Sequence, residues 1–452
     1  MSKPHQTPRI VALQALLRVE QDAGYSNIVL DKALENSGLS ERDKALAAAI
    51  FYGVLEKRLT LDYYIEKCLS DPGRKPDRTA LEAIRCGVYQ ILYMNRVPDS
   101  AAVNETVQAV KVMGKANLVG FVNGVLRGLI RRKEQIKLPK DDSLYALSIR
   151  YSIPEGLIRL WMDGYGEQTT LRLLESLTEK PKLFIRVNRT KCSREDLELS
   201  LNENGIKILP LQDLPYAAAL ENCGAPDALS QFRQGMFHVQ DISAQRVCQI
   251  LDPQPGEIIC DCCAAPGGKT FTIAQEVGSN GRVFSLDLYK NRVRLIENGA
   301  KRLGLTNIEA RANDALMGFE GIPPVDKMLC DVPCSGFGVI QRKPEIRYKD
   351  IGTLKDLPKL QYQILQNASK CVKPGGLLVY STCTLNPAEN NEVAEKFLQE
   401  NNGFEPIKNI DTGVRRTVAE PGHMLTMMPF AGASDGFFVA AFRKKDRTGA
   451  DN

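Results

Sequence analysis

Two motifs in the C-terminal half of the chain combine cysteine with the small residues of tight turns. The first, LCDVPCSG, contains Asp331 and Cys334, and the second, YSTCTL, contains Cys383. Each motif follows a run of apolar, strand-like residues. A lone cysteine is more often a small buried hydrophobic residue than a catalytic group. Two cysteines and a carboxylate after separate strand ends instead favour thiol chemistry.

This set of side chains suits the methylation of a pyrimidine ring. Carbon 5 of the ring is not nucleophilic, but a thiolate that adds to carbon 6 makes carbon 5 part of an enamine, which can take a methyl group. A carboxyl group at ring nitrogen 3 would stabilise the charge that develops. The thiolate must leave after carbon 5 loses its proton, and a second thiol could assist that release.

A third motif, DCCAAPGGKT, follows the strand-like run 257–262 and provides a turn of small residues. Small residues let a ligand approach the backbone, and the following helix offers free N–H groups. An ATP-binding P-loop would need glycine where Cys263 stands, and the chain has no GxGxxG motif, so ATP and dinucleotides are disfavoured.

Acidic residues end the next two strand-like runs. Asp287 suits the hydroxyls of an adenosine ribose, and Asp314 is placed to touch an adenine edge. The alternative is that each aspartate caps the segment that follows it. Together with the small-residue turn, the two aspartates favour a nucleoside cofactor.

The elements that must position these motifs alternate from about residue 240 onward. The expected strands are 257–262, 282–286, 308–312, 327–330, 376–381 and a last strand at GFFVAAF, and the expected helices are 269–277, a helix ending at Gly304, a helix running to about Val372, and 389–400. This alternation predicts an α/β fold with a parallel, doubly wound sheet. Ligands bind beyond the carboxyl ends of such strands, where the motifs lie.

Three further segments precede this sheet. Apolar residues recur at helical spacing throughout 1–140, which predicts an all-α domain. We expect residues 141–180 to form a helical connector and 181–240 to form a small α+β subdomain, with the strands LFIRVN and IKILPL and a helix at 193–204. The fourth segment, 241–446, is the main domain.

Composition limits the class of protein. The chain has 452 residues, of which 43% are hydrophobic and 25% charged, an ordinary globular mixture. No apolar stretch is long enough to span a bilayer and no signal core follows the N-terminus, so we expect a cytoplasmic protein. The 12 cysteines are read as reduced thiols, and with only three histidines we expect no metal site.

Charge is distributed unevenly along the chain. Residues 1–140 carry 22 basic and 15 acidic residues, whereas the remainder carries 37 basic and 39 acidic residues. This difference hints at a polyanionic partner for the N-terminal part, although a solvated basic surface is as probable on charge alone.

The three motifs, in this order and spacing, resemble the Nop2/Sun class of RNA cytosine-5 methyltransferases. The segments GMFHVQDISAQ (235–245) and HMLTMMPF with DGFFVAAF also fit that class, and the helical N-terminal domain resembles the RNA-binding NusB fold. This pairing is typical of bacterial 16S rRNA methyltransferases. The resemblance therefore implies a Rossmann-like methyltransferase sheet preceded by a small α+β subdomain and an all-α NusB-like domain.

The resemblance also implies S-adenosylmethionine as methyl donor and a role for each candidate residue. The cofactor turn would comprise Cys263, Ala264, Ala265, Pro266, Gly267, Gly268 and Lys269. Lys269 would lie near the methionine carboxylate, Asp287 at the ribose and Asp314 on the adenine side. Asp331 would touch the amino-acid end of the cofactor or the target base, and Arg292 would help to seat the cofactor or the RNA.

The family pattern makes Cys383 the nucleophile and Cys334 the releasing thiol. DNA cytosine-5 methyltransferases use the Pro-Cys cysteine instead, so Cys334 is the rival nucleophile. The expected partner is 16S rRNA, naked or in an early assembly state, bound by a monomer. The candidate RNA contacts are Arg9, Arg18, Arg85, Arg127, Arg131 and Arg132. The alternatives are the same chemistry on tRNA, or a NusB-like binding module with an inactive methyltransferase domain.

Overall fold

The computed structural model describes residues 6–22, 26–71, 73, 76–431 and 435–446, with the backbone alone for 20–22 and 431. The chain forms two compact units. One contains 1–162 together with 340–349, and the other contains 163–339 and 350–452. No helix in the described ranges is long and apolar enough to cross a membrane.

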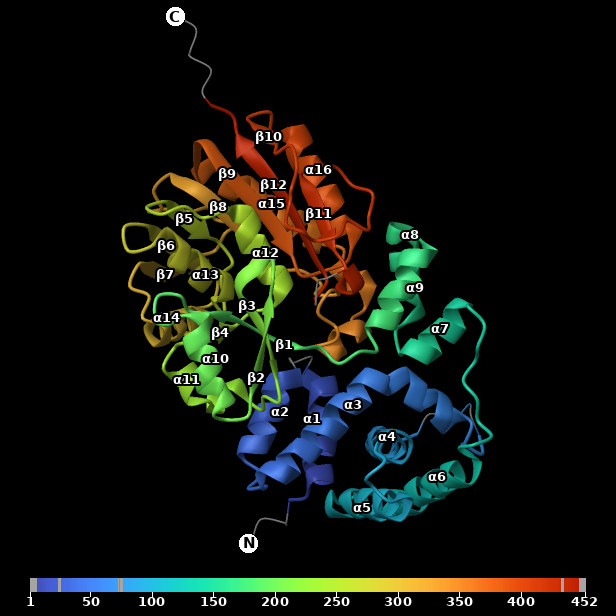
Figure 1. Cartoon of the computed structure of the whole chain (residues 1–452). Helices are drawn as coiled ribbons and strands as arrows, with labels where there is room; N and C mark the ends of the chain where they lie inside the picture. Colours follow the sequence, from blue (N-terminus) through green and yellow to red (C-terminus); the bar gives the residue numbers. More distant parts are fainter. Residues whose placement is uncertain (1–5, 23–25, 72, 74–75, 432–434, 447–452) are drawn as a thin grey trace, which may run out of the picture. The chain divides into compact units, whose positions relative to one another are not determined.

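The first unit is helical. Its elements are α1 (Pro8–Asp22), α2 (Ser26–Glu35), α3 (Glu41–Glu66), α4 (Arg78–Tyr93), α5 (Asp99–Val112), η1 (Ala116–Leu118), α6 (Val119–Arg132), α7 (Leu144–Tyr151) and most of α8 (Glu155–Tyr165). The side chains of Ser40 and Asp77 accept backbone N–H bonds and so cap the starts of α3 and α4. The helices α1 and α3–α6 enclose a core that includes Phe51, Ile84 and Leu126 (Figure 1).

The second unit is built on a large sheet with the strand order β10-β12-β9-β8-β5-β6-β7, and β11 pairs with β12. The strands are β5 (Ile258–Asp261), β6 (Arg282–Asp287), β7 (Ile308–Ala312), β8 (Val325–Asp331), β9 (Val372–Thr382), β10 (Phe404–Pro406), β11 (Met424–Met427) and β12 (Phe437–Lys444). Strands β5 to β9 pair in parallel and β12 is antiparallel to β9. The order reverses between β5 and β8, which makes that point the topological switch of the sheet.

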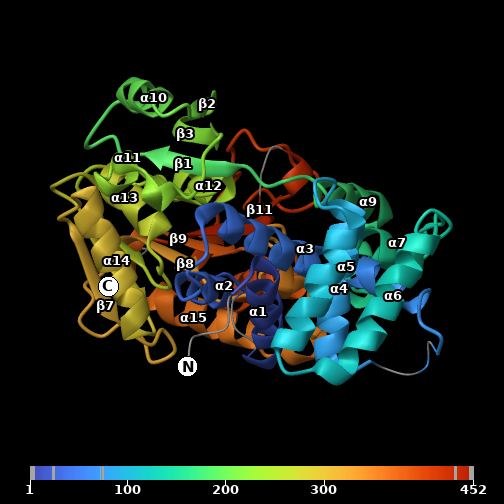
Figure 2. The same ribbon diagram turned by 90° about the horizontal axis from the view of Figure 1, so that it is seen from below.

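Alternate residues of the strands pack into two separate cores. Cys260 and Met328 face a core shared with α15 (Leu357–Cys371) and α16 (Asn391–Glu400). Ile259 and Leu329 face a core shared with α12 (Ile242–Leu251), α13 (Gly268–Val277) and α14 (Lys290–Leu303). Helices thus cover both faces, with α15 on one side of β8 and β9 and α12 and α13 on the other (Figure 2), so the predicted doubly wound α/β sheet is confirmed.

A smaller sheet precedes the large one in the same unit. It has the order β2-β3-β1-β4, all antiparallel pairs, with β1 (Leu183–Val187), β2 (Lys207–Leu211), β3 (Leu214–Glu221) and β4 (Phe237–Val239). The remaining elements of this region are α9 (Glu167–Ser176), α10 (Arg194–Asn202), η2 (Pro226–Ala228) and α11 (Ser230–Arg233). Strands β3 and β4, like β10 and β11, have no counterpart among the predicted strands.

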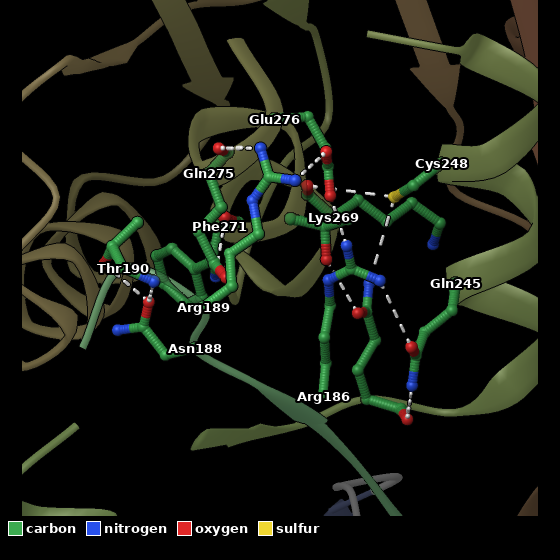
Figure 3. A network of polar contacts seen from close by, with 12 residues as sticks. Arg186, Asn188, Arg189, Thr190, Gln245, Cys248, Lys269, Phe271, Gln275 and Glu276 are labelled. Carbon is green, nitrogen blue, oxygen red and sulfur yellow. Dashed lines mark hydrogen bonds and ion pairs between the residues drawn. The ribbon is translucent and has the colours of Figure 1, made fainter. Parts of the chain in front are cut away.

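A polar network joins the small sheet to helix α13 (Figure 3). Arg186 of β1 is buried and donates to Glu276, and the Arg189 guanidinium lies 3.0 Å from the same carboxylate. Gln245 of α12 donates to the carbonyl of Ile185 at 3.1 Å. The small sheet therefore binds helix α13 through charged side chains, near the C-terminal end of the helix.

The segment after the Pro-Cys motif differs from expectation. The helix that runs to Cys371 begins only at Leu357, and the chain before it forms turns with the short helices η3 (Pro344–Tyr348) and η4 (Ile351–Leu354). Pro333 and Gly336, which has a φ of +81°, interrupt regular structure directly after β8.

Candidate active site

The predicted cofactor turn lies at the switch point of the sheet. It leaves β5, which is flanked by β6 and β8, and enters α13 at Gly268. Gly267 has a φ of +109°, and a Cβ there would lie 2.5 Å from the Phe271 ring. Both the backbone angle and the close ring require glycine at this position. The turn thus presents bare backbone and the N-terminus of a helix at the sheet edge.

Lys269 and Asp331 meet at the ends of β5 and β8. The Lys269 Nζ donates to Asp331 Oδ2 at 2.7 Å, and the Ser381 hydroxyl donates to Asp331 Oδ1 at 2.8 Å. Burial disfavours the charged ammonium, but the charge and hydrogen bond of Asp331 outweigh it and raise the pKa of Lys269 above its usual value. One carboxylate therefore links the start of α13 to the ends of β8 and β9.

Asp287 lies beside the same turn at the end of β6 and is buried. Its Oδ2 accepts from the backbone N–H of Ala265 at 3.3 Å, and its Oδ1 accepts from that of Tyr289 at 3.2 Å. Arg292 donates to the carbonyl of Ala265 at 2.9 Å and lies 3.5 Å from Asp287 Oδ2. The carboxylate both caps the following turn and braces the cofactor turn.

Asp314 follows β7, the strand beside β6, and is exposed. Its Oδ1 accepts from the backbone N–H of Leu316 at 2.9 Å, so it stabilises a local turn. The position on the sheet edge is as expected, and the capping role weighed as its alternative is present too.

The two catalytic candidates Cys334 and Cys383 are in contact. Their sulfur atoms lie 3.3 Å apart, and both side chains are partly exposed. The hydrogen bond to Cys383, together with burial, raises the pKa of Cys334 well above its usual value. Cys334 therefore keeps its proton near neutral pH.

Sequence reasoning missed the buried side chains that hold the Cys334 turn. The Glu389 carboxylate accepts from the backbone N–H of Ser335 at 2.9 Å and from the Gln361 amide at 2.8 Å. The same Gln361 amide donates to the carbonyl of Pro333 at 2.9 Å. Both peptide groups that flank Cys334 are thus fixed. Glu389 and Gln361 are polar residues at fully buried positions. Their burial would have marked them as site residues, but it cannot be read from the sequence alone.

Hydroxyl groups tie the two cysteine turns together. The hydroxyls of Ser335 and Thr384, each adjacent to a candidate cysteine, are 2.6 Å apart. The backbone N–H of Gly338 donates to the carbonyl of Cys383 at 3.0 Å. This double link sets the distance between the two thiols.

Asp261, the last residue of β5, is a second site residue that the sequence did not single out. It is buried, its Oδ2 accepts from the Thr270 hydroxyl at 2.8 Å, and its Oδ1 has no hydrogen-bond partner among the described residues. Burial raises its pKa to about 7. An unpartnered buried oxygen at this edge fits a polar ligand bound to the turn.

Comparison with known proteins gives this geometry its context. A family model described as 16S rRNA methyltransferase RsmB/F matches residues 248–443, a NusB family model matches 6–131, and a ferredoxin-like domain model of RsmF/B-like methyltransferases matches 153–225. A probable ribosomal RNA small subunit methyltransferase B of Bacillus subtilis is 36% identical over 444 residues, which cover 97% of this chain and 98% of that protein. The chain belongs to the RsmB/F family of 16S rRNA methyltransferases.

Other relatives agree with this assignment. The ribosomal RNA small subunit methyltransferase B of Escherichia coli O1:K1 is 35% identical over 98% of this chain and 100% of its own length. A crystal structure of a methyltransferase homologue from Pyrococcus horikoshii is 28% identical, with a TM-score of 0.59, over 68% of this chain and 100% of that one. The NSun6 structure from the same organism, at 22% identity and a TM-score of 0.60 over 64% of this chain and 98% of that one, shares the fold.

As a member of the RsmB/F family, the protein is an RNA methyltransferase that uses S-adenosylmethionine. The site fits this cofactor, because the turn is free of bulky side chains, Asp287 is held beside it and Asp261 has an unsatisfied oxygen. Lys269 and the N-terminus of α13 supply positive charge for a carboxylate.

The basic residues proposed as RNA contacts occupy different environments in the NusB-like region. Arg18, Arg127, Arg131 and Arg132 are exposed, and Arg9 is half-buried and donates to Gln90 at 2.8 Å. Arg85 was wrongly included. It is buried, because Asp62 and Glu82 bind its guanidinium and neutralise its charge, so it does not face RNA.

Proposed function

We propose that this protein transfers a methyl group to carbon 5 of a specific cytosine in 16S rRNA through a covalent cysteine adduct at carbon 6. The observation that carries the proposal is the pair of thiols, Cys334 and Cys383, with sulfur atoms 3.3 Å apart at the sheet edge that also holds Asp331 and the cofactor turn. A methyltransferase acting on an amine or hydroxyl has no need of two thiols at this edge.

The first step assigns Cys383 as nucleophile. Its sulfur forms a bond to carbon 6, and the electron pair of the carbon 5–carbon 6 double bond moves so that carbon 5 becomes nucleophilic. Bound S-adenosylmethionine supplies an electrophilic methyl group. Asp331, fixed at the end of β8 by Lys269 and Ser381, is the candidate carboxyl group to face ring nitrogen 3.

The second step assigns Cys334 to release of the product. Carbon 5 gives its proton to a base, for which a solvent water molecule is the candidate. The electrons of that carbon–hydrogen bond re-form the double bond between carbons 5 and 6, and the bond between carbon 6 and Cys383 breaks with its electrons going to the sulfur. Because Cys334 retains its proton, it can give that proton to the departing sulfur across the 3.3 Å contact. Glu389 and Gln361, which bind the peptide groups on either side of Cys334 and are together called the Glu389 and Gln361 clamp, hold Cys334 in place for this transfer.

The substrate proposal rests on the NusB-like region and on the names of the relatives. NusB-like domains bind RNA, and the full-length relatives are rRNA small subunit methyltransferases. Naked 16S rRNA or an early assembly intermediate, bound by one copy of the chain, is the proposed complex. Methylation of tRNA by the same residues is the second candidate, since the pocket motifs do not distinguish the two RNAs.

The test compares wild type, Cys383→Ala and Cys334→Ala with methyl-labelled S-adenosylmethionine and 16S rRNA transcribed in vitro. Methyl incorporation and denaturant-resistant protein–RNA adducts are measured together. Wild type should methylate, Cys383→Ala should neither methylate nor form an adduct, and Cys334→Ala should accumulate the adduct.

Each other outcome identifies a specific error. If the two variants exchange behaviours, Cys334 is the nucleophile, as in DNA cytosine-5 methyltransferases. If wild type modifies tRNA but not 16S rRNA, the substrate is wrong while the chemistry stands. If wild type binds the cofactor but modifies neither RNA, the inactive-module alternative replaces the proposal.

A further inference from the structure

A short segment that follows the Cys334 turn belongs to the helical unit. Residues 340–349 cluster with 1–162, although the chain on both sides of them belongs to the methyltransferase unit. We call residues 340–349 the inserted segment. Its residues Ile340, Ile346 and Arg347 are buried, with exposed fractions of 0%, 4% and 2%.

The inserted segment occupies a gap in the hydrogen bonding of α3. At Lys57 the backbone of this helix leaves helical geometry, with φ −106° and ψ 16°. Such a kink removes intrahelical partners from nearby backbone groups. The Arg347 guanidinium donates to the carbonyl of Glu56 at 2.8 Å, and the Tyr348 hydroxyl donates to the carbonyl of Leu55 at 2.9 Å. The carbonyls at the kink are thus paired by the inserted segment.

Ser152 completes the same arrangement from the end of α7. It adopts a left-handed conformation with φ +55°, and its hydroxyl accepts from the backbone N–H of Leu59 at 2.9 Å. The same hydroxyl lies 3.0 Å from the Tyr348 hydroxyl, and Arg347 also reaches the Ser152 carbonyl at 3.4 Å. A non-glycine residue in this conformation, together with the kink, indicates that the helical unit is shaped to receive Arg347 and Tyr348.

The chain directly before the inserted segment is the turn that carries Cys334. Within the methyltransferase unit, Gly338 donates to the carbonyl of Cys383 at 3.0 Å and accepts from the backbone N–H of Gly436 at 2.8 Å. Only Val339 separates Gly338 from Ile340, the first residue of the inserted segment. The chain that carries Cys334 is thus hydrogen-bonded to Cys383 at Gly338 and, two residues later, enters a segment that packs within the helical unit.

We propose that Arg347 and Tyr348 are positioning residues, through which the RNA-binding helical unit holds the Cys334 turn in place for the release step. This inference rests on the proposed function, in which Cys334 frees the product from Cys383. Under this proposal, the helical unit binds RNA and also sets the rate at which the covalent adduct breaks down to product.

The test uses the full chain with Arg347→Lys, since lysine keeps the charge but cannot bond the carbonyls of Glu56, Ser152 and Ile340 together. Arg85→Lys is the matched control, because Arg85 is equally buried in the same unit but binds carboxylates away from the inserted segment. Methylation at saturating cofactor and RNA, denaturant-resistant adduct and melting temperature are measured for wild type and both variants.

Arg347→Lys should slow turnover by about tenfold or more and accumulate the adduct. Arg85→Lys should lower the melting temperature without adduct above the wild-type level. A merely structural role for Arg347 would make the two variants alike, with loss of stability and no adduct, and that result would overturn the proposal.

Tyr348→Phe keeps the test decisive if Arg347→Lys does not fold. It removes one hydroxyl, bonded to Leu55 and Ser152, and should give the same adduct signature at a smaller amplitude. Unchanged adduct in a folded Tyr348→Phe protein would then overturn the proposal. Turnover by wild type in the same assay separates this failure from failure of the proposed function.

Discussion

Replacing Gly338 by alanine should disable the active site through the backbone alone. A Cβ at this position would lie 1.9 Å from the carbonyl oxygen of Gly436 and 2.9 Å from that of Cys383. Neither neighbour is a flexible side chain, so the two backbone segments must separate by about 1 Å to reach the shortest contacts that Cβ atoms make.

The size of the effect follows from what that separation breaks. The hydrogen bond from Gly436 to the Gly338 carbonyl, at 2.8 Å, is lost, which leaves buried polar groups at a cost of about 1–3 kcal/mol. Steric misfit in a packed site adds about 1–3 kcal/mol. The free energy of unfolding should therefore fall by about 2–6 kcal/mol. A displacement of this size at the Cys383 carbonyl should slow methyl transfer by about 100-fold.

The assay is single-turnover methyl transfer at saturating cofactor and RNA, with thermal unfolding of the same samples. Gly403→Ala is the control, because a Cβ at Gly403 meets nothing within 4 Å and its φ is not positive. That control should stay within about 0.5 kcal/mol of wild type. Wild-type rate and melting temperature in Gly338→Ala would refute the close approach of the two glycine segments.

Three further predictions concern charged groups. Burial raises the folded pKa of Asp261 to about 7, above its unfolded value, so its contribution to stability is present at acidic pH and is lost as pH rises toward neutrality. Asp261→Asn should therefore gain melting temperature relative to wild type as the pH is raised from about 5 to 8, and a constant difference across that range would contradict the shift. Lys269→Met should weaken S-adenosylmethionine binding by about 10- to 100-fold in equilibrium dialysis, because it removes the ammonium group at the turn and leaves Asp331 without its cation. Arg186→Met should lower the free energy of unfolding by about 1–3 kcal/mol, since it removes one of the two arginines that bind the partly exposed Glu276 (Figure 3), and Glu276→Gln in the same chain should restore part of the loss in thermal unfolding.

The main sheet and the edge that holds the site were predictable from local sequence. Alternating runs and small residues identify strand ends, and parallel strands place those ends together. Cys334 and Cys383 could thus be brought to one edge without a structure. Their 3.3 Å contact could not, because it depends on hydrogen bonds such as that between Ser335 and Thr384, whose residues are 49 positions apart.

What the sequence could not reveal depends on contacts between distant residues. The Glu389 and Gln361 clamp acts on the Cys334 turn from 54 and 28 positions away, and no local pattern marks either residue. Arg85 has the spacing of a basic surface residue, and only its contacts with Asp62 and Glu82 reveal that it is buried. The periodicity of apolar residues likewise does not reveal that residues 340–349 pack within the helical unit.

The kink in α3 also has a consequence for the order in which the chain is completed on the ribosome. The residues that pair its free carbonyls, Arg347 and Tyr348, emerge only after the 177 residues from 163 to 339 have been made. At about 5–20 residues per second, that interval is on the order of 10–35 s. During this interval the N-terminal helices have been synthesised, but the two side chains that bond the carbonyls of Glu56 and Leu55 have not. The helical unit thus reaches its final hydrogen bonding only once the strand and turn that carry Asp331 and Cys334 exist.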